Sequence, residues 1–70
     1  MSEEKTLGQR VQAARARLGL SQVAMAERYS IPRRTLQDWE LDRRTPPEYV
    51  VKLLEVVVED HGIDPYKDRP

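Results

Sequence analysis

Two adjacent arginines and a glutamine lie close together in the segment SIPRRTLQDWE, residues 30–40. Arg33 and Arg34 follow Pro32 directly, and Gln37 comes three residues after Arg34. A guanidinium is a planar fork that can bond two acceptors on a guanine edge, and a Gln amide can pair in the same way with adenine. These residue types therefore indicate hydrogen bonding to base edges. The alternative is that both arginines are solvated side chains on an exposed helix face.

The helix that would carry these side chains is predicted over residues 32–41. Because the residue before a proline disfavours the helical region, Pro32 is expected at the first helical position. At about 100° per residue, Pro32, Leu36 and Trp39 fall on one side, which is expected to be buried. The opposite side carries the polar residues Arg33, Arg34, Gln37 and Asp38. One face would thus anchor the helix while the other is presented outward, with a helix N-terminus that attracts phosphate.

Two helices are predicted before this one. Thr6 and Gln9 read as a capping box in front of a helix with apolar residues at helical spacing, and Gly19 would end it. Ser21 is a favourable N-cap for a second helix, in which Ala26 is small enough for close helix approach. A tight connection then joins the second helix to the third, which is the helix-turn-helix arrangement.

A fourth helix is predicted after a polar loop. Thr45 would be its cap, Pro46 its first residue and Glu48 the second half of a capping box. The helix is expected to continue to about His61. This histidine is the only one in the chain, and its expected role is a favourable charge at the helix C-terminus rather than metal binding or catalysis.

The length and composition indicate one small all-α domain, expected over residues 1–62, with a flexible tail at 63–70. The absence of cysteine excludes disulfides and thiolate metal sites. No apolar run is long enough to span a membrane and the first residues are polar, so we expect a cytoplasmic protein with no membrane partner. The carboxylates have no nucleophile or base beside them, and no Gly-rich phosphate loop occurs. We therefore expect no enzyme activity, no cofactor and no metal.

The net charge is zero, but the charges are unevenly distributed. Residues 5–52 contain ten Lys and Arg against five Asp and Glu, whereas five acids face two bases from residue 53 onward. This asymmetry indicates an anionic partner for the middle of the chain. A mixed, solvated surface is the alternative that composition alone leaves open.

Residues 7–58 resemble the phage-repressor and Xre-type helix-turn-helix proteins, which are bacterial and phage transcription regulators. The matching pieces are LGLSQ at the start of the second helix, Ala26, TLQDWE in the third helix, and the RRTPP that follows. The resemblance implies a compact bundle of four to five helices, similar to the DNA-binding domain of lambda repressor. It also implies sequence-specific binding to double-stranded DNA, as a small repressor or as the antitoxin of a toxin–antitoxin pair.

The resemblance further implies roles for single residues. The positions that match base-reading residues of the recognition helix are Arg33, Arg34, Gln37 and Asp38. The positions that match phosphate-contacting residues are Gln22, Thr35, Arg43 and Arg44. Arg15 and Glu40 match a partly buried ion pair between the first and third helices. The positions expected to anchor the core are Ala26, Leu36 and Trp39.

Two positions depart from the family pattern, and a third carries a charge that opposes DNA. Ser30 replaces the usual glycine of the turn, where a positive φ is less comfortable for serine. Asp42 replaces a glycine in the loop after the third helix, and aspartate tolerates the left-handed region better than most residues. Asp38, at a base-reading position, would repel phosphate and would suit a cytosine amino group.

The last helix has more apolar residues than one buried face requires, because seven of the nine residues 50–58 are apolar. The residues sufficient to close the core are Tyr49, Val50, Leu53, Leu54 and Val57, which leaves Val51, Val56 and Val58 for a partner. A second copy packed there would form a two-fold homodimer. A wider core, or cover by the tail through Ile63 and Tyr66, would leave no interface. The same surplus supports an alternative function, a helical module that binds a toxin or another protein with weak or no DNA binding.

Overall fold

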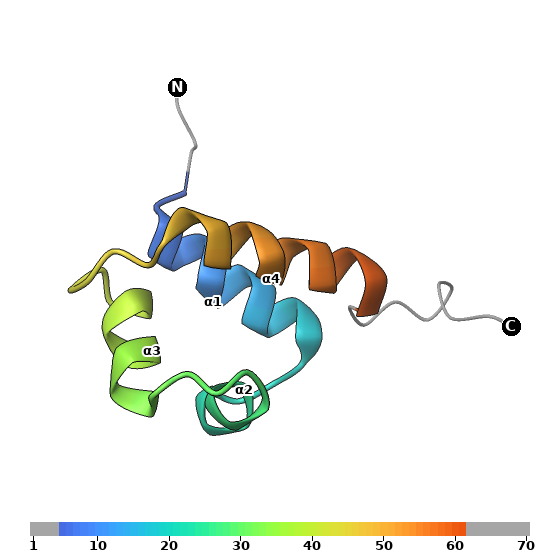
Figure 1. Cartoon of the computed structure of the whole chain (residues 1–70), viewed down its shortest axis with the longest axis horizontal. Coiled ribbons are helices and arrows are strands. Elements are labelled where there is room, and N and C mark those ends of the chain that lie inside the picture. Colours follow the sequence, from blue (N-terminus) through green and yellow to red (C-terminus); the bar gives the residue numbers. More distant parts are fainter. Residues whose placement is uncertain (1–4, 62–70) are drawn as a thin grey trace, which may run out of the picture.

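The computed structural model describes residues 5–61, which form four α-helices without a strand (Figure 1). The helices are α1 (Leu7–Leu18), α2 (Gln22–Arg28), α3 (Arg33–Glu40) and α4 (Glu48–His61). The predicted all-α fold is therefore confirmed. The predicted tail, 63–70, lies outside the described residues. None of the described helices has the length and apolar character needed to cross a bilayer.

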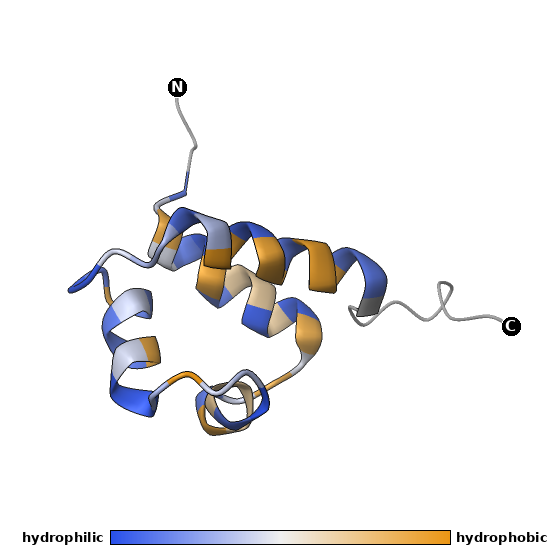
Figure 2. Cartoon of the chain, viewed as in Figure 1, coloured by the Kyte–Doolittle hydropathy of each residue, from blue (hydrophilic) through white to orange (hydrophobic). Residues whose placement is uncertain are grey.

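Helix α1 lies at the centre of the arrangement. It packs along α4 on one side and contacts α3 on another, while α2 packs against α3 (Figure 1). Hydrophobic residues run along both α1 and α4, the two helices that lie side by side (Figure 2). The fully or nearly buried apolar side chains come from all four helices: Val11, Ala14, Met25, Ala26, Leu36, Val51, Leu54 and Val58. The polar face of α3 is thus left on the outside of this core.

Both ends of α1 and the start of α2 lie where local chemistry predicts. Thr6 Oγ1 accepts the Gln9 backbone N–H at 3.0 Å, and Gln9 Oε1 accepts the Thr6 N–H at 2.9 Å. This reciprocal pair is the predicted capping box. Gly19 ends α1 in the left-handed conformation at φ 70°, and Ser21 Oγ caps α2 by accepting the Ala24 N–H at 3.0 Å.

Helices α3 and α4 both begin later than predicted. Pro32 is the N-cap of α3 rather than its first residue, with an extended ψ of 135°, and it is exposed rather than part of the buried side. Helix α4 begins at Glu48, two residues after Pro46. The physical reason is the second proline, because Pro47 disfavours the helical conformation for the residue before it. Pro46 is instead fully buried.

The rotation of α4 about its axis also differs from the prediction. Val51 and Val58, expected on a partner surface, are buried in the core with Leu54. Tyr49 and Leu53, expected in the core, are 69% and 59% exposed. The prediction is therefore wrong for Val51 and Val58, since a buried side chain offers no surface to a partner. Val56 is exposed, as expected.

Gly8 permits the close approach of α1 to the C-terminal end of α3. A Cβ added at Gly8 would overlap the backbone carbonyl oxygen of Trp39 and would lie 2.6 Å from Asp42 Oδ1. The obstacle is a backbone atom of a neighbouring helix, so it cannot turn away as a flexible side chain could. Helix α3 can therefore take this position only if residue 8 has no side chain.

We predict that Gly8→Ala lowers the free energy of unfolding, measured by urea denaturation. Helix propensity alone would favour alanine by about 1 kcal/mol. The overlap with the Trp39 carbonyl should outweigh that gain, because overpacking costs about 1–3 kcal/mol. Gln12→Ala, at an exposed position of the same helix, is the control and should change stability by less than about 0.5 kcal/mol. Equal or higher stability of Gly8→Ala would show that the two helices are not in this contact.

Candidate nucleic-acid interface

Helices α2 and α3 are joined by a tight turn that fixes the start of α3. The Tyr29 N–H donates to the Met25 carbonyl at 3.0 Å, and the Ile31 N–H donates to the Ala26 carbonyl at 2.9 Å. Ser30, between them, has a φ of 57°, so the left-handed turn geometry is adopted without glycine. Ile31 packs against the core. The turn therefore fixes the direction in which the chain enters α3.

Helix α3 has a buried and an exposed side, as the sequence predicts. Leu36 is fully buried and Trp39 is partly buried against the core. Arg33 and Arg34, in the first turn, are exposed, and Gln37 is half-buried. The two arginines therefore project from a helix whose opposite side is held in the core.

The loop after α3 folds back onto the helix and carries two more arginines. The backbone N–H groups of Arg43 and Arg44 donate to the Asp38 carbonyl at 2.8 and 3.3 Å. Asp42 makes this return possible with a φ of 60° and donates its N–H to the Trp39 carbonyl at 3.1 Å. Both arginines are exposed. The loop thus holds two cations beside the end of α3.

A buried carboxylate connects α3 to the two helices before it. Glu40 accepts from Arg15 Nε at 2.7 Å and Arg15 Nη2 at 2.9 Å, so the predicted ion pair is present and bidentate. It also accepts from Gln22 Nε2 at 3.0 Å, and Arg15 Nη1 donates to the Leu20 carbonyl at 3.0 Å. The Glu40 side chain is 3% exposed. The predicted phosphate role of Gln22 must therefore rely on its second amide N–H.

Asp38 differs from the expected outward base-reading residue. Its side chain is 13% exposed, and its carboxylate lies between two guanidinium groups. Oδ1 is 3.6 Å from Arg34 Nε, and Oδ2 is 4.0 Å from Arg44 Nε. The four-residue spacing of Arg34 and Asp38 could have revealed the first contact. The contact to Arg44 depends on how the loop folds back.

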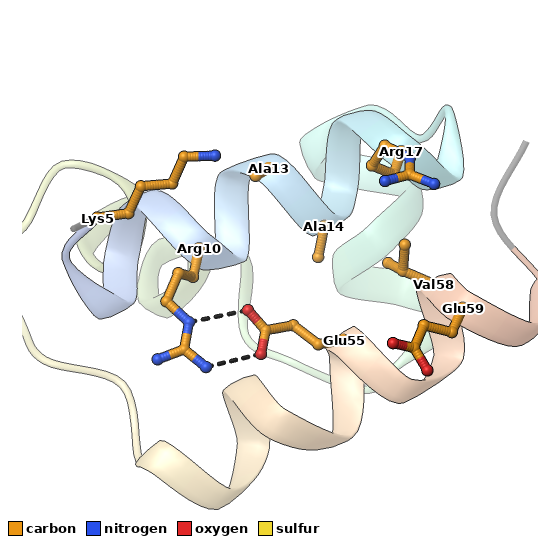
Figure 3. Close-up of a pocket in the computed structure, with 8 residues that line it drawn as sticks. All are labelled: Lys5, Arg10, Ala13, Ala14, Arg17, Glu55, Val58 and Glu59. Carbon is orange, nitrogen blue, oxygen red and sulfur yellow. Dashed lines mark hydrogen bonds and ion pairs between the residues drawn. The ribbon is translucent and has the colours of Figure 1, made fainter. Parts of the chain in front are cut away.

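A second bidentate ion pair, which the sequence analysis missed, fixes α4 against α1. Arg10 Nε and Nη2 donate to the two carboxylate oxygens of Glu55 at 2.8 and 2.6 Å (Figure 3). The hydrogen bond from Arg10 lowers the pKa of Glu55, and the same bond raises the pKa of Arg10. Lys5 and Arg17 lie along the same groove between α1 and α4. This groove is formed without residues of α3, so its charges belong to a different surface.

The exposed charge around α3 is more positive than the sequence indicates. Residues 27–44 contain five arginines and four acids. Glu40 is buried in its ion pair and Asp38 is largely covered between two arginines, which leaves Glu27 and Asp42 as the exposed acids. The five exposed cations are Arg28, Arg33, Arg34, Arg43 and Arg44. Such a surface attracts a polyanion.

Comparison with known families identifies one match, a model described as helix-turn-helix, over residues 11–57. The matched range contains α2, α3, the turn between them and most of α1 and α4. Neither the curated proteins nor the solved structures contain a match to the chain.

We predict that Glu40→Ala strongly destabilises the protein, because it leaves the Arg15 guanidinium without its carboxylate in a largely buried position. Breaking one partner of a buried pair costs about 3–5 kcal/mol. Urea denaturation followed by circular dichroism measures the loss. Glu27→Ala removes an exposed acid from α2 and should stay within about 0.5 kcal/mol of the parent. If Glu40→Ala and Glu27→Ala lowered the free energy of unfolding by equally small amounts, Glu40 would not hold the three helices together.

Proposed function

The chain belongs to the helix-turn-helix family of the phage-repressor and Xre type, and on that premise we propose that it regulates transcription by sequence-specific binding to double-stranded DNA. Helix α3 is the proposed recognition helix, placed in the major groove. The observation that carries the proposal is the pair of exposed arginines at the first turn of a helix whose other side is buried. The role that we propose is that of a small repressor.

The proposed base contacts come from the first two turns of α3. Arg33 and Arg34 are exposed there, and each guanidinium can bond guanine O6 and N7. Gln37 follows one turn later and can pair with adenine. Residues at the N-terminal end of a recognition helix are those that reach base edges. The base-reading role is therefore proposed for these three side chains, and Asp38 is given a different role below.

The proposed phosphate contacts flank the recognition helix. Arg43 and Arg44 are exposed in the loop that folds back over α3, where a groove-bound helix would bring the DNA backbone close. Thr35 lies in the first turn of α3, and Gln22 opens α2 with one amide N–H left over from its bond to Glu40. Pro32 provides no capping side chain, so the first N–H groups of α3 are also available to a phosphate oxygen.

We also propose a two-fold homodimer, formed through an apolar face of α4. Tyr49, Leu53 and Val56 follow each other at helical spacing and are all exposed. Leu53 also lines an apolar groove together with Trp39 of α3 and Ile31 of the turn. A continuous exposed face of this kind needs cover. Since a recognition helix of eight residues contacts few base pairs, a second copy would double the site and match a palindromic sequence.

A second candidate function uses the same apolar face of α4. An antitoxin would bind its toxin there, so the chain would act as a protein-interaction module with weak or no DNA binding. Salt titration distinguishes the two functions, because DNA binding must weaken steeply as salt rises, with a slope of about 0.9 per phosphate contact. Binding to duplexes that is absent or insensitive to salt would favour the interaction module.

The proposed DNA function is tested by selecting bound duplexes from a random pool and then comparing variants on the selected site. Arg34→Ala should cost about 1–3 kcal/mol on that site and relax the preference at one base pair. Arg43→Ala should weaken binding to all duplexes alike and reduce the salt slope by about 0.9. Arg17→Ala removes the same charge in the α1–α4 groove, so it should change the affinity least. Equal losses for Arg34→Ala on selected and random duplexes would refute the base-reading assignment.

The proposed dimer is tested by sedimentation equilibrium of Leu53→Lys beside the parent. A charged side chain at the centre of the apolar face should shift the protein to monomer, because burying an unpaired charge is costly. Glu59→Gln changes the net charge by the same amount at an exposed position of α4 and should leave the mass unchanged. A monomeric parent, or a dimer that Leu53→Lys does not weaken, would rule out this interface.

A further inference from the structure

We propose that Asp38 is a specificity-determining residue that restrains Arg34 and Arg44 and so penalises binding to DNA of the wrong sequence. The proposal rests on the DNA function proposed above and assigns a role to a carboxylate that lies among the binding residues. An acid at this position opposes phosphate by its charge. A gain in affinity for DNA therefore cannot explain why Asp38 lies next to two of the arginines.

The geometry of Asp38 makes it the link between the recognition helix and the loop. Its carbonyl accepts the backbone N–H groups of Arg43 and Arg44, at 2.8 and 3.3 Å. Its two carboxylate oxygens face Arg34 Nε at 3.6 Å and Arg44 Nε at 4.0 Å. The Asp38 side chain is 13% exposed, whereas the two arginine side chains are 79% and 67% exposed. One acid thus restrains two cations that still reach solvent.

The side of each guanidinium that faces Asp38 determines which N–H groups the arginine can still donate to DNA. In both arginines Nε is the nearest nitrogen to the carboxylate. A guanidinium carries five N–H groups, so the Nη1 and Nη2 groups at the far end remain free. Arg34 can therefore place that end on guanine O6 and N7 while its Nε stays beside Asp38. Contact with the correct base and contact with Asp38 are compatible.

On a random duplex, the contact of Arg34 with DNA and its contact with Asp38 are not compatible in this way. Without the correct base, Arg34 gains only by turning toward a phosphate, which takes it away from Asp38. The carboxylate then faces the DNA backbone without its partner, and like charges at an interface are repulsive. The penalty falls on wrong sequences more than on the correct one, which is how specificity arises from an unfavourable contact. The arginine partner of each ion pair is solvent-exposed, so the pairs contribute little to stability.

The test compares Asp38→Asn with the parent on two probes, the duplex selected by the parent from a random pool and a scrambled duplex of the same composition. Affinities are measured by fluorescence anisotropy at several salt concentrations. We expect Asp38→Asn to tighten scrambled binding by about three- to tenfold, as removal of one charge near phosphates should. The selected duplex should change less, so that the ratio of the two affinities falls by at least about threefold. The melting temperature should stay close to that of the parent.

Asp42→Asn is the matched control, because it removes the same charge four residues away, in the loop after α3. Asp42 is exposed and forms no ion pair with the part of the chain that the structure describes, and Asn tolerates its positive φ. This variant should tighten both duplexes by a similar factor and leave the ratio unchanged. Equal behaviour of Asp38→Asn and Asp42→Asn would overturn the proposal, since charge alone would then explain both.

A double substitution separates a restraint on Arg34 from a general effect on folding. In the Arg34→Ala background, Asp38→Asn should lose most of its effect on the ratio of affinities. An undiminished effect in that background would also overturn the proposal. Failure of the proposed DNA function would give a different result. The parent itself would then bind every duplex no more tightly than the scrambled one.

Discussion

The position of the recognition helix depends on one buried carboxylate. Glu40 ends α3 inside the protein, where an unpaired charge would be costly, and it is satisfied by donors from α1 and α2. Arg15 uses its remaining Nη1 to hold the Leu20 carbonyl, between those two helices. Three helices and the connection between the first two are therefore fixed relative to a single side chain. Such a pair contributes orientation more surely than stability, because its desolvation offsets much of its attraction.

Close backbone contacts, together with the buried ion pair, fix the position of α3. Gly8 lets α1 reach the Trp39 carbonyl, next to Glu40 in the chain. Ser30 and Asp42 adopt positive φ values at the two ends of α3, so the chain can enter and leave the helix sharply. With both ends and the inner side held, α3 has little freedom to rotate. The outward direction of Arg33 and Arg34 is thus a consequence of contacts on the opposite side of the helix.

The parts of the fold governed by local chemistry could be predicted, and those governed by distant contacts could not. Caps and periodicity located α1 and α2, and the family resemblance identified the Arg15–Glu40 pair. The run of residues 50–58 is apolar on nearly every side, so its pattern could not indicate which side is buried. The ion pair of Arg10 with Glu55, 45 residues away, provides the missing information. On a helical wheel Glu55 lies about 40° from Val51 and about 160° from Leu53, so turning Glu55 toward α1 buries the first and exposes the second.

The two acids of α3 show why a sequence pattern alone does not assign their roles. Asp38 and Glu40 are two residues apart, which places them about 160° apart around the helix. Glu40 faces inward and is paired with an arginine from another helix, so it determines where α3 lies. Asp38 faces the arginines of the outer surface, where ion pairs are weak enough to be exchanged for contacts with DNA. The inward pair must be fixed in its geometry because the position of the helix depends on it. The outward pairs must be weak because, under the proposed function, Arg34 and Arg44 have to bond DNA while they lie beside the protein's own carboxylate.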